Sequence, residues 1–401
     1  MAYSTSDTHP SLTPPGYIDP KVKKELENQP FVIGKCPQMC PVSEIKMRER
    51  EGLIHLLETD PSVFPEKRRR EKLRCDPAKA VKCYQRSAAG LDLQNPNLLR
   101  PPLVLSQTVD YLLTKVVYDE RLPWSERYSF IFDRLRAVKQ DLIIQQPNAL
   151  DCIRILEPMV RFYVVSAYWG TRNDNNGKQE TVSADFSPVL NRKQLEECLK
   201  YLLSLYDEVG DFNCSSRSQM EAVYQLLYLG ETEALLRGIV LPIEIMSQDV
   251  QHALKVSLAW YNKQYSTVIR NSKHLSLFLS MAFSLSLPRI RRHALDVMNT
   301  AYSSKNLHFP LEVLTCILNF QNAYEARLCC ENYGVTVSEN RVCFLKGNFA
   351  ADKQEMDFNG VEYIDEALKR NKLCNLLMNN LDGANTTNIC CDIDKLQLNE
   401  E

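Results

Sequence analysis

Apolar residues recur at helical spacing through most of the middle of this chain. One such stripe runs from Leu105 to Val116, with apolar side chains every three or four positions. Similar stripes, each about 12 to 20 residues long, follow one another to Leu287 and are separated mostly by short polar loops. Short loops favour antiparallel helices that stack as neighbours. No fixed repeat period is present, so the pattern predicts an irregular, TPR-like helical array over residues 102–287.

The individual helices of this array are located by their start and stop signals. A helix that begins near Ser125 should end at Gln145, and the next should begin at Pro147, a residue tolerated in a first turn. Pro158 should kink or split that second helix. Asn191 to Gln194 has the form of a capping box, with Asn in the Ser/Thr place, and predicts a further helix. Three more helices are expected: one ending at Gly230, one beginning after Ser247 and one covering about residues 273–286.

The segment from Asp133 to Gln145 is the most informative stretch of the array. Its apolar positions share one face of a helix and are expected in the core: Leu135, Val138, Leu142 and Ile143. Charged residues flank that face, and three of them are predicted as structural ties: Arg134, Arg136 and Asp141. We expect the two arginines to pair with carboxylates on neighbouring helices. The alternative is that they are solvated, as most charged side chains are.

The pattern changes near Pro288. The expected elements, in order, are helices over 289–302, Phe309–Phe320 and Asn322–Asn332, then strands over Val335–Val337 and Arg341–Leu345. Gly334 lies just past the third helix, where a glycine C-cap is common. Three helices followed by a short β-hairpin are typical of a winged helix, which we predict over residues 288–350.

The two ends of the chain differ from the middle. Residues 1–30 are polar, contain several prolines, and are predicted to be a disordered tail. Residues 31–101 form a basic, proline-punctuated segment with one helix, capped by Ser43 and running to about Glu58. Residues 351–401 are predicted to be an acidic tail with one helix over about 361–379 and a disordered end.

Charge is unevenly distributed although its total is small. The formal net charge is −2, so bulk charge does not predict binding to nucleic acid or to a membrane. Residues 46–86, however, hold 12 lysines and arginines against 7 acids, whereas residues 351–401 hold 5 against 11. The chain therefore has a basic front and an acidic end.

The composition is that of a soluble, intracellular globular protein. Of 401 residues, 44% are hydrophobic and 24% are charged, which is enough for a sizeable core. The start of the chain lacks the basic and apolar regions of a signal peptide, so the 14 cysteines are expected to be reduced thiols. No apolar run reaches the roughly 18 to 20 residues that span a bilayer, and no membrane partner is expected.

No arrangement of residues typical of an active site is found. The 13 glycines form no phosphate-binding loop or dinucleotide fingerprint, and no nucleophile elbow or zinc-protease motif is present. The six histidines are scattered, one per segment: His9, His55, His252, His274, His293 and His308. No catalytic residue, cofactor or small-molecule substrate is predicted. An enzyme of this sequence would need a deep pocket lined by converging titratable groups.

Cys36 and Cys40, in the stretch Cys-Pro-Gln-Met-Cys-Pro, are the best candidates for metal ligands. Two thiolates could bind zinc, but a structural zinc site needs four ligands. The second pair would have to come from Cys75, Cys83 or His55, whose spacing matches no standard zinc module. The alternative, which we favour, is a proline-restrained turn whose small thiols pack inward.

Two groups of basic residues are candidate contacts for nucleic acid or for an acidic protein partner. The first could also be a nuclear localisation signal or a solvated loop, and comprises Lys67, Arg68, Arg69, Arg70, Lys72 and Arg74. The second lies on the first helix of the predicted winged helix and comprises Arg289, Arg291 and Arg292.

Direct reading of DNA by the third helix of the predicted winged helix is not expected. A helix of that kind needs Lys and Arg side chains, yet residues 321–334 hold Arg327 against Glu325 and Glu331. Residues 321–350 as a whole carry three acids and three bases. We therefore expect this unit to pair with protein, with weak nucleic-acid contact along its first helix.

Five blocks of the chain, taken in order, resemble the opening of the Sac-three/GANP family. The first, Gly34-Lys-Cys-Pro-Gln-Met-Cys-Pro41, resembles the family's Gly-Thr-Cys-x-x-Met-Cys-Pro. The block Ala80–Gly90 ends in the family's Arg-Ser-Ala-Ala-Gly. The other three blocks are Glu44–Glu51, Leu99–Leu105 and the helix over 133–145. A weaker likeness continues over about residues 156–350.

This resemblance implies a TPR-like helical array followed by a PCI-type winged helix, in agreement with the pattern described above. It also implies a non-catalytic scaffold. Long members of the family act in messenger-RNA export at the nuclear pore, within the transcription-export complex two. There they pair with another PCI protein and a small acidic subunit, and form a nucleic-acid-binding surface.

The chain departs from the long members, because it has neither their Phe-Gly repeats nor their long helix behind the winged helix. Its layout resembles short stand-alone members, which are associated with the centrosome and spindle. We therefore expect a scaffold that acts through protein–protein pairing in centrosome duplication and mitotic spindle assembly, located in nucleus and cytoplasm and at the centrosome in dividing cells. The expected partner is another PCI winged-helix protein. The alternative is a nuclear mRNA-export scaffold that also contacts single-stranded RNA, and an enzyme with no recognisable motif is least favoured.

Overall fold

The chain folds into a mainly helical protein with one small antiparallel sheet. The computed structural model describes residues 32–60, 73–86, 94–170, 186–210, 216–356 and 360–379. The expected disordered tail over 1–30 lies outside these residues. Among the described helices, none combines the length and hydropathy that crossing a bilayer requires.

The described residues of the segment before the array contain one regular helix, α2 (Val42–Glu51), and two single turns of 3-10 helix, η1 (Leu56–Glu58) and η3 (Pro96–Leu98). The expectation of one helix running to Glu58 was wrong. Gly52 adopts the left-handed conformation, with φ at 71°, and ends α2 at Glu51. The start was also misassigned, since Pro41 and not Ser43 occupies the N-cap position.

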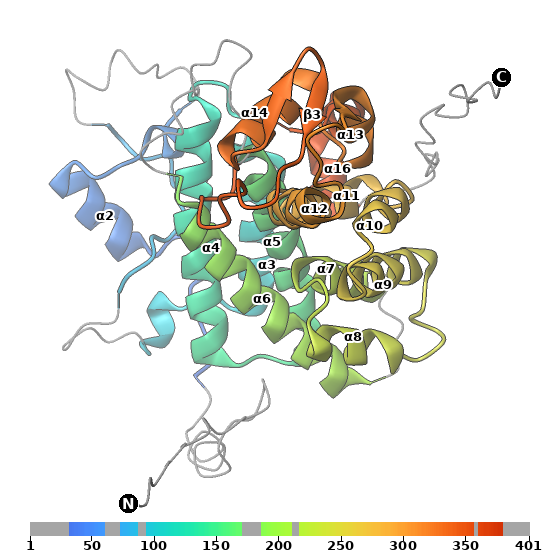
Figure 1. The fold of residues 1–401 in the computed structure, drawn as a ribbon. Helices are drawn as coiled ribbons and strands as arrows, with labels where there is room; N and C mark the ends of the chain where they lie inside the picture. The colour runs from blue at the N-terminus through green and yellow to red at the C-terminus, as the bar shows by residue number, and fades with distance from the viewer. Residues whose placement is uncertain are drawn as a thin grey trace, which may run out of the picture.

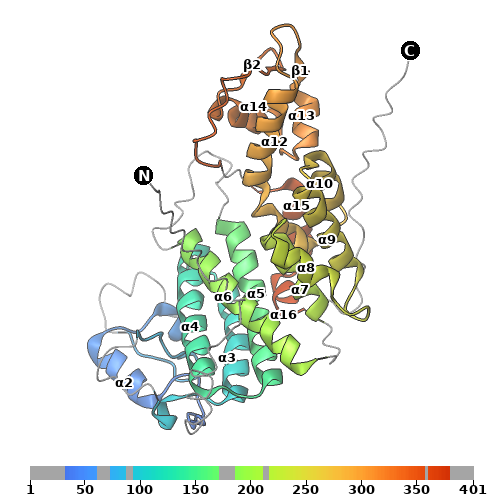
Figure 2. The same cartoon turned by 60° about the horizontal axis from the view of Figure 1, so that its bottom comes forward.

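The array follows as a succession of helices packed against their neighbours (Figures 1 and 2). Its elements are α3 (Pro102–Thr114), η4 (Val116–Tyr118), α4 (Trp124–Gln145), α5 (Ala149–Gly170), α6 (Pro188–Val209), α7 (Arg217–Leu227), α8 (Thr232–Ile239), α9 (Gln248–Tyr261), α10 (Tyr265–Ser272) and α11 (Leu277–Ser284). α5 packs along α6, α7 along α9, and α9 along α10. One continuous apolar core runs through these helices.

Two local expectations for the array need correction. Of the kink or split expected at Pro158, the split is wrong, because α5 continues without interruption from Ala149 to Gly170. Asn191 is not a cap: Ser187 holds that position, and Asn191 lies buried inside α6. There it donates to the carbonyl of Tyr163 at 2.9 Å and accepts from the hydroxyl of Tyr128 at 3.1 Å, so it joins helices in place of starting one.

The apolar face of α4 is narrower than the sequence pattern indicates. Leu135, Val138 and Leu142 are fully buried, as expected. Ile143, expected beside them, is 53% exposed. Neighbouring positions of a helix lie about 100° apart, so one step beyond Leu142 already leaves the buried stripe.

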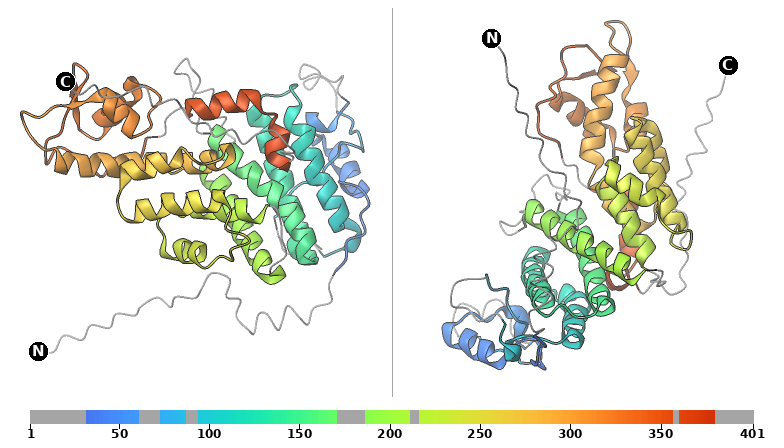
Figure 3. Two further views of the ribbon diagram at one scale, coloured as in Figure 1. Left: turned by 90° about the vertical axis from the view of Figure 1, so that its right-hand side faces the viewer. Right: turned by 90° about the horizontal axis from the view of Figure 1, so that it is seen from below.

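A second, smaller core belongs to a C-terminal α/β unit, residues 287–350. Its elements, in order, are α12 (Leu287–Ala301), β1 (Phe309–Pro310), α13 (Leu311–Ile317), α14 (Ala323–Asn332), β2 (Thr336–Ser338) and β3 (Arg341–Cys343). The three helices and the hairpin were expected, whereas β1 was not. It adds a third antiparallel strand in the order β1-β3-β2. The views agree that this unit and the segment containing α2 lie at opposite ends of the array (Figures 2 and 3).

The described residues after this unit do not form a simple acidic tail. Over residues 360–379 there are two helices in place of the one expected, α15 (Glu362–Arg370) and α16 (Leu373–Met378). They return to the array, where α15 packs on α11 and α16 on α3 and α5 (Figure 3). Leu376 and Leu377 are buried in the core of the array.

Candidate functional site

The polar edge of α4 faces the segment of residues 31–101, not solvent. Asp141, predicted as a structural tie, is fully buried. One of its carboxylate oxygens accepts from Lys82 Nζ at 2.7 Å and the other from Arg100 Nε at 2.8 Å. Both cations belong to the preceding segment, so Asp141 joins that segment to the array from the inside.

Arg134, the second predicted tie, reaches the same segment through a buried glutamate. Its guanidinium lies 3.5 Å from Glu58 and 2.6 Å from Asp133, and stacks over the ring of Phe130. Glu58 also accepts from Arg48 at 2.6 Å and from the backbone N–H of Val81 at 3.0 Å. Burial alone would raise the pKa of Glu58, but Arg134 and Arg48 hold this pKa below its ordinary value. Glu58 is therefore an ionised carboxylate inside the protein.

Arg136, the third predicted tie, has a different partner from the one expected. Its guanidinium lies 3.8 Å from the centre of the Tyr84 ring, a cation–π contact, and 5.9 Å from that of Phe132. Tyr84 also lies in the segment before the array. The polar edge of α4 thus binds the protein's own N-terminal segment and is not a site for an external ligand.

Cys36 and Cys40 are both buried. Cys40 packs against Ile45 and Ala80, and its sulfur accepts from Arg48 Nη2 at 3.3 Å. Burial raises the pKa of the Cys40 thiol well above its ordinary value, so the sulfur is a protonated packing group. Within the described part of the chain, no three His, Cys, Asp or Glu side chains are placed to share a metal ion.

The basic cluster before Cys75 is only partly visible. Lys67, Arg68, Arg69, Arg70 and Lys72 lie outside the described residues. Arg74 is described and is exposed. The backbone N–H of the next residue, Cys75, donates to Glu49 of α2 at 3.0 Å, so Arg74 lies beside α2.

The three arginines of α12 do not form one basic surface. Arg291 is buried and donates to the carbonyls of Leu318 and Asn319, so it has no exposed face for a phosphate group. Arg292 pairs with Glu355 at 3.6 Å, and Arg289 stacks over Trp260 at 5.1 Å. The predicted nucleic-acid contact along this helix therefore loses Arg291, and the other two arginines are largely committed inside the protein.

The described surface of the α/β unit is mixed, and five large apolar side chains are exposed among its polar and charged ones. These five are Val297, Tyr302, Leu307, Val313 and Tyr324. Tyr324, on α14, is 67% exposed, whereas Arg327 of the same helix reaches the carbonyl of Val337 and Asn340 in the hairpin, at 3.4 Å each. Exposed aromatic and aliphatic groups of this kind are what protein interfaces use.

A second exposed apolar patch was not predicted from the sequence. It lies at the corner between α8 and α9, where the exposed fractions are Leu236 57%, Ile239 58%, Val240 74% and Ile243 80%. The run Ile-Val-Leu-Pro-Ile over 239–243 was the available signal, because the proline marks a turn in which apolar side chains have no helix face to occupy.

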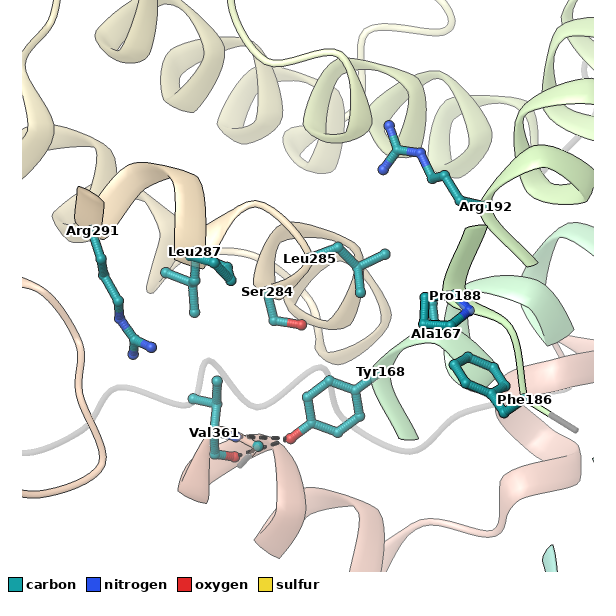
Figure 4. Close-up of a pocket in the computed structure, with 12 residues that line it drawn as sticks. Ala167, Tyr168, Phe186, Pro188, Arg192, Ser284, Leu285, Leu287, Arg291 and Val361 are labelled. Carbon is teal, nitrogen blue, oxygen red and sulfur yellow. Dashed lines mark hydrogen bonds between the residues drawn. The ribbon is translucent and has the colours of Figure 1, made fainter. Parts of the chain in front are cut away.

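A cleft of about 200 Å³ lies where α5, α6, α11, α12 and the start of α15 meet (Figure 4). Its polar groups are occupied by protein partners. The hydroxyl of Tyr168 donates to Asp365 at 2.6 Å and accepts from the N–H of Val361 at 3.0 Å, and Arg192 donates to the carbonyl of Leu227 at 3.0 Å. The cleft marks the joint between the array, the α/β unit and the returning C-terminal helices.

Comparison with known proteins gives a family match over most of the chain. The family model described as SAC3/GANP family matches residues 39–339. The similar proteins include SAC3 family protein 1 of Schizosaccharomyces pombe, 27% identical over 80% of this chain and 32% of that protein. Protein xmas of Drosophila melanogaster is 23% identical over 76% of this chain and 15% of its own length. SAC3 family protein B of Arabidopsis thaliana is 31% identical over 46% of this chain and 10% of its own length. The chain thus spans about a third or less of these relatives.

Proposed function

Since this chain belongs to the SAC3/GANP family, we propose that it is a non-catalytic scaffold that holds partner proteins on a rigid helical frame. Membership of this family suggests a scaffold in mRNA export or a related process. The frame suits such a role, because a single apolar core runs from the helices next to α2 to those that meet the α/β unit. Surfaces at its two ends are therefore held at a fixed separation.

The observation that carries the proposal is the exposure of large apolar side chains on α13 and α14 of the α/β unit. The order helix, strand, helix, helix and two strands supports its assignment as a PCI-type winged helix. The neutral charge of α14 and its hairpin argues against recognition of base pairs in a DNA groove. We propose that Tyr324 and Val313, which are 67% and 44% exposed, pack against the winged helix of another PCI protein.

For the cellular process, we propose centrosome duplication and mitotic spindle assembly, with the protein in nucleus and cytoplasm and at the centrosome in dividing cells. The burial of Arg291 and the pairing of Arg292 support a role through protein contacts. The second candidate is nuclear mRNA export with contact to single-stranded RNA. It is favoured by the basic composition of residues 46–86.

The test of the pairing surface is affinity purification of the tagged full-length protein from dividing cells, with identification of the proteins that co-purify. Tyr324→Asp places a charge in the proposed interface and should remove a partner that wild type retains. Val189→Asp is the matched control, because Val189 is 77% exposed on α6, at a distance along the chain from the α/β unit. Equal partner recovery by the two variants would reject this surface.

The same experiment separates the two processes. Centrosomal proteins among the partners, together with concentration of the tagged protein at centrosomes during division, support the spindle role. Recovery of mRNA-export subunits alone, with no concentration at centrosomes, would replace that role with the export role. Both outcomes leave the scaffold assignment in place, which fails only if the wild-type protein retains no protein partner.

A further inference from the structure

A cysteine and a histidine face each other on the outer surface of the small sheet. β1 pairs antiparallel with β3 through Phe309 and Val342, so His308, one residue before β1, comes opposite Cys343. Their side chains are in contact, with 2.9 Å between His308 Nδ1 and Cys343 Sγ. Among the described residues, Cys343 is the cysteine whose sulfur contacts a histidine.

Cys343 points outward because successive strand residues alternate between the two faces of a sheet. Its neighbours Val342 and Phe344 are buried in the core of the α/β unit, whereas Cys343 is partly exposed and His308 is exposed. The thiol and the imidazole are therefore both accessible to a small molecule in solution.

Charged residues of both signs lie close to this pair in the sequence. Three exposed cations, Lys305, Arg341 and Lys346, lie within four residues of His308 or Cys343 along the chain. The exposed acids in the same intervals are Glu312 and Glu339. Cys343 is thus partly exposed and in contact with a histidine, two features that distinguish reactive cysteines from inert buried ones.

We propose that Cys343 is a reactive thiol with His308 as its base, and that small anionic disulfides such as glutathione disulfide convert it to a mixed disulfide. His308 Nδ1 accepts the thiol proton as the Cys343 sulfur attacks one sulfur of the small disulfide. The S–S bond of that molecule breaks, and a new S–S bond joins one half to Cys343. The other half leaves as a thiolate and takes the proton from the imidazole. Cys343 is oxidised and the small disulfide is reduced, so no other reactant is needed.

The chain offers matched comparisons for this chemistry. Cys316, on α13 of the same unit, is exposed. It tests whether accessibility alone is sufficient for a thiol to react with the small disulfide. Cys75 and Cys83 are partly accessible, but burial raises the pKa of these thiols to about 11 and about 12, which keeps them protonated. Cys329 and Cys330 are buried in the α/β unit and report whether it stays folded.

The experiment treats the reduced full-length protein with glutathione disulfide at neutral pH and follows each of the 14 cysteines by peptide mass spectrometry. We expect Cys343 to react faster than Cys316. In His308→Gln, which keeps a polar side chain but removes the base, the Cys343 rate should fall by at least about tenfold while the Cys316 rate is unchanged. Thr336→Val, on the other side of Cys343 in the sheet, is the control and should leave the rate near wild type.

Equal rates for Cys343 and Cys316 in the wild-type protein would overturn the proposal, and this comparison does not depend on any variant. Retention of the Cys343 rate in His308→Gln, with Cys329 and Cys330 still protected, would overturn it as well. The readout is chemical and needs no partner, so it is independent of the proposed scaffold function.

Discussion

At the scale of single residues, two buried carboxylates join the segment before α3 to α4. Asp141 is shared by Lys82 and Arg100, and Glu58 by Arg48 and Arg134. Buried ion pairs add little net stability, because desolvation offsets their attraction, but losing one partner is costly. We infer that these two carboxylates determine how the segment before α3 packs on α4, because a shifted segment would leave buried charges without partners.

Replacing Asp141 by Ala tests the first of these groups. It leaves Lys82 and Arg100 buried without their carboxylate, and we expect the free energy of unfolding to fall by about 3 to 5 kcal/mol in urea denaturation. The control is Glu51→Ala, because Glu51 is 51% exposed in its pair with Arg50. This substitution should lower the free energy of unfolding by less than about 1 kcal/mol. Comparable losses for the two variants would contradict the assigned role of Asp141.

The depressed pKa of Glu58 predicts a dependence of stability on pH. The ordinary pKa of this group is 4.5, and its folded value is lower, so its contribution is complete above the ordinary value and is lost as pH falls through the folded value. Glu58→Gln should therefore be less stable than wild type at pH 7. The gap between the two proteins should narrow as pH is lowered below about 4, measured by urea denaturation at each pH. A gap that stays constant down to pH 3 would show that Glu58 is not ionised in the folded protein.

The residues of this cluster were predictable only in part. Helical spacing on α4 identified Arg134, Arg136 and Asp141 as flanking charges, but it assigned their partners to neighbouring helices of the array. The actual partners, such as Lys82 and Glu58, come from irregular backbone tens of residues earlier in the chain. A segment without periodicity gives no signal of which side chains it turns inward.

At the scale of elements, regularity decided what could be predicted. α4 repeats its pattern over 22 residues, and it begins and ends within about one residue of the positions expected. α8 and α10, of eight residues each, were missed because two turns carry too little pattern to separate them from loops. β1, of two residues, exists only because β3 pairs with it.

Two adjacent residues of α4 test its assigned faces. Leu142→Asp places an unpaired charge in the core and should prevent folding of the array, with a cost of at least about 4 to 5 kcal/mol. Ile143→Asp introduces the same charge one position away, at a 53% exposed site, and should change the free energy of unfolding by about 0.5 kcal/mol. Soluble expression and circular dichroism distinguish the two. Folded Leu142→Asp protein with wild-type stability would show that the helix is rotated from the orientation described.

The hydroxyl group of Tyr168 is one of the contacts that hold α15 and α16 on the array. Tyr168 holds the start of α15 through Val361 and Asp365, so Tyr168→Phe should weaken this attachment by about 1 to 3 kcal/mol. Amide hydrogen exchange over residues 361–378 should become faster, while exchange in α14 stays the same. Tyr324→Phe, at an exposed tyrosine, is the control. Unchanged exchange in Tyr168→Phe would mean that apolar contacts alone hold these helices.

At the scale of the whole molecule, the described segments before the array and after the α/β unit both pack on the same array. Before α3 the chain is tied to α4 through Asp141, and after the α/β unit it returns so that the N–H of Cys374 donates to Tyr118 at 2.7 Å. Composition could not predict this return. The acidic composition of residues 351–401 indicates a segment exposed to solvent, and it does not show that the apolar residues of this segment pack on the array. These parts of the array are therefore covered by the protein itself, whereas exposed apolar side chains of the α/β unit and of the α8–α9 corner face outward.

Whether the basic front binds nucleic acid is a property of the whole molecule, tested by the dependence of affinity on salt. If single-stranded RNA is bound, its affinity should fall steeply as salt rises, because each neutralised phosphate releases a counterion. Replacing Lys67, Arg68, Arg69 and Arg70 by Ala should reduce the logarithmic salt slope by up to about 3, since each phosphate that is no longer neutralised lowers it by about 0.7. Arg289→Ala with Arg292→Ala should leave that slope unchanged, since one of these side chains stacks on Trp260 and the other pairs with Glu355. No binding to any single-stranded RNA at low salt would remove the export alternative in its RNA-contacting form and leave protein pairing as the function of the scaffold.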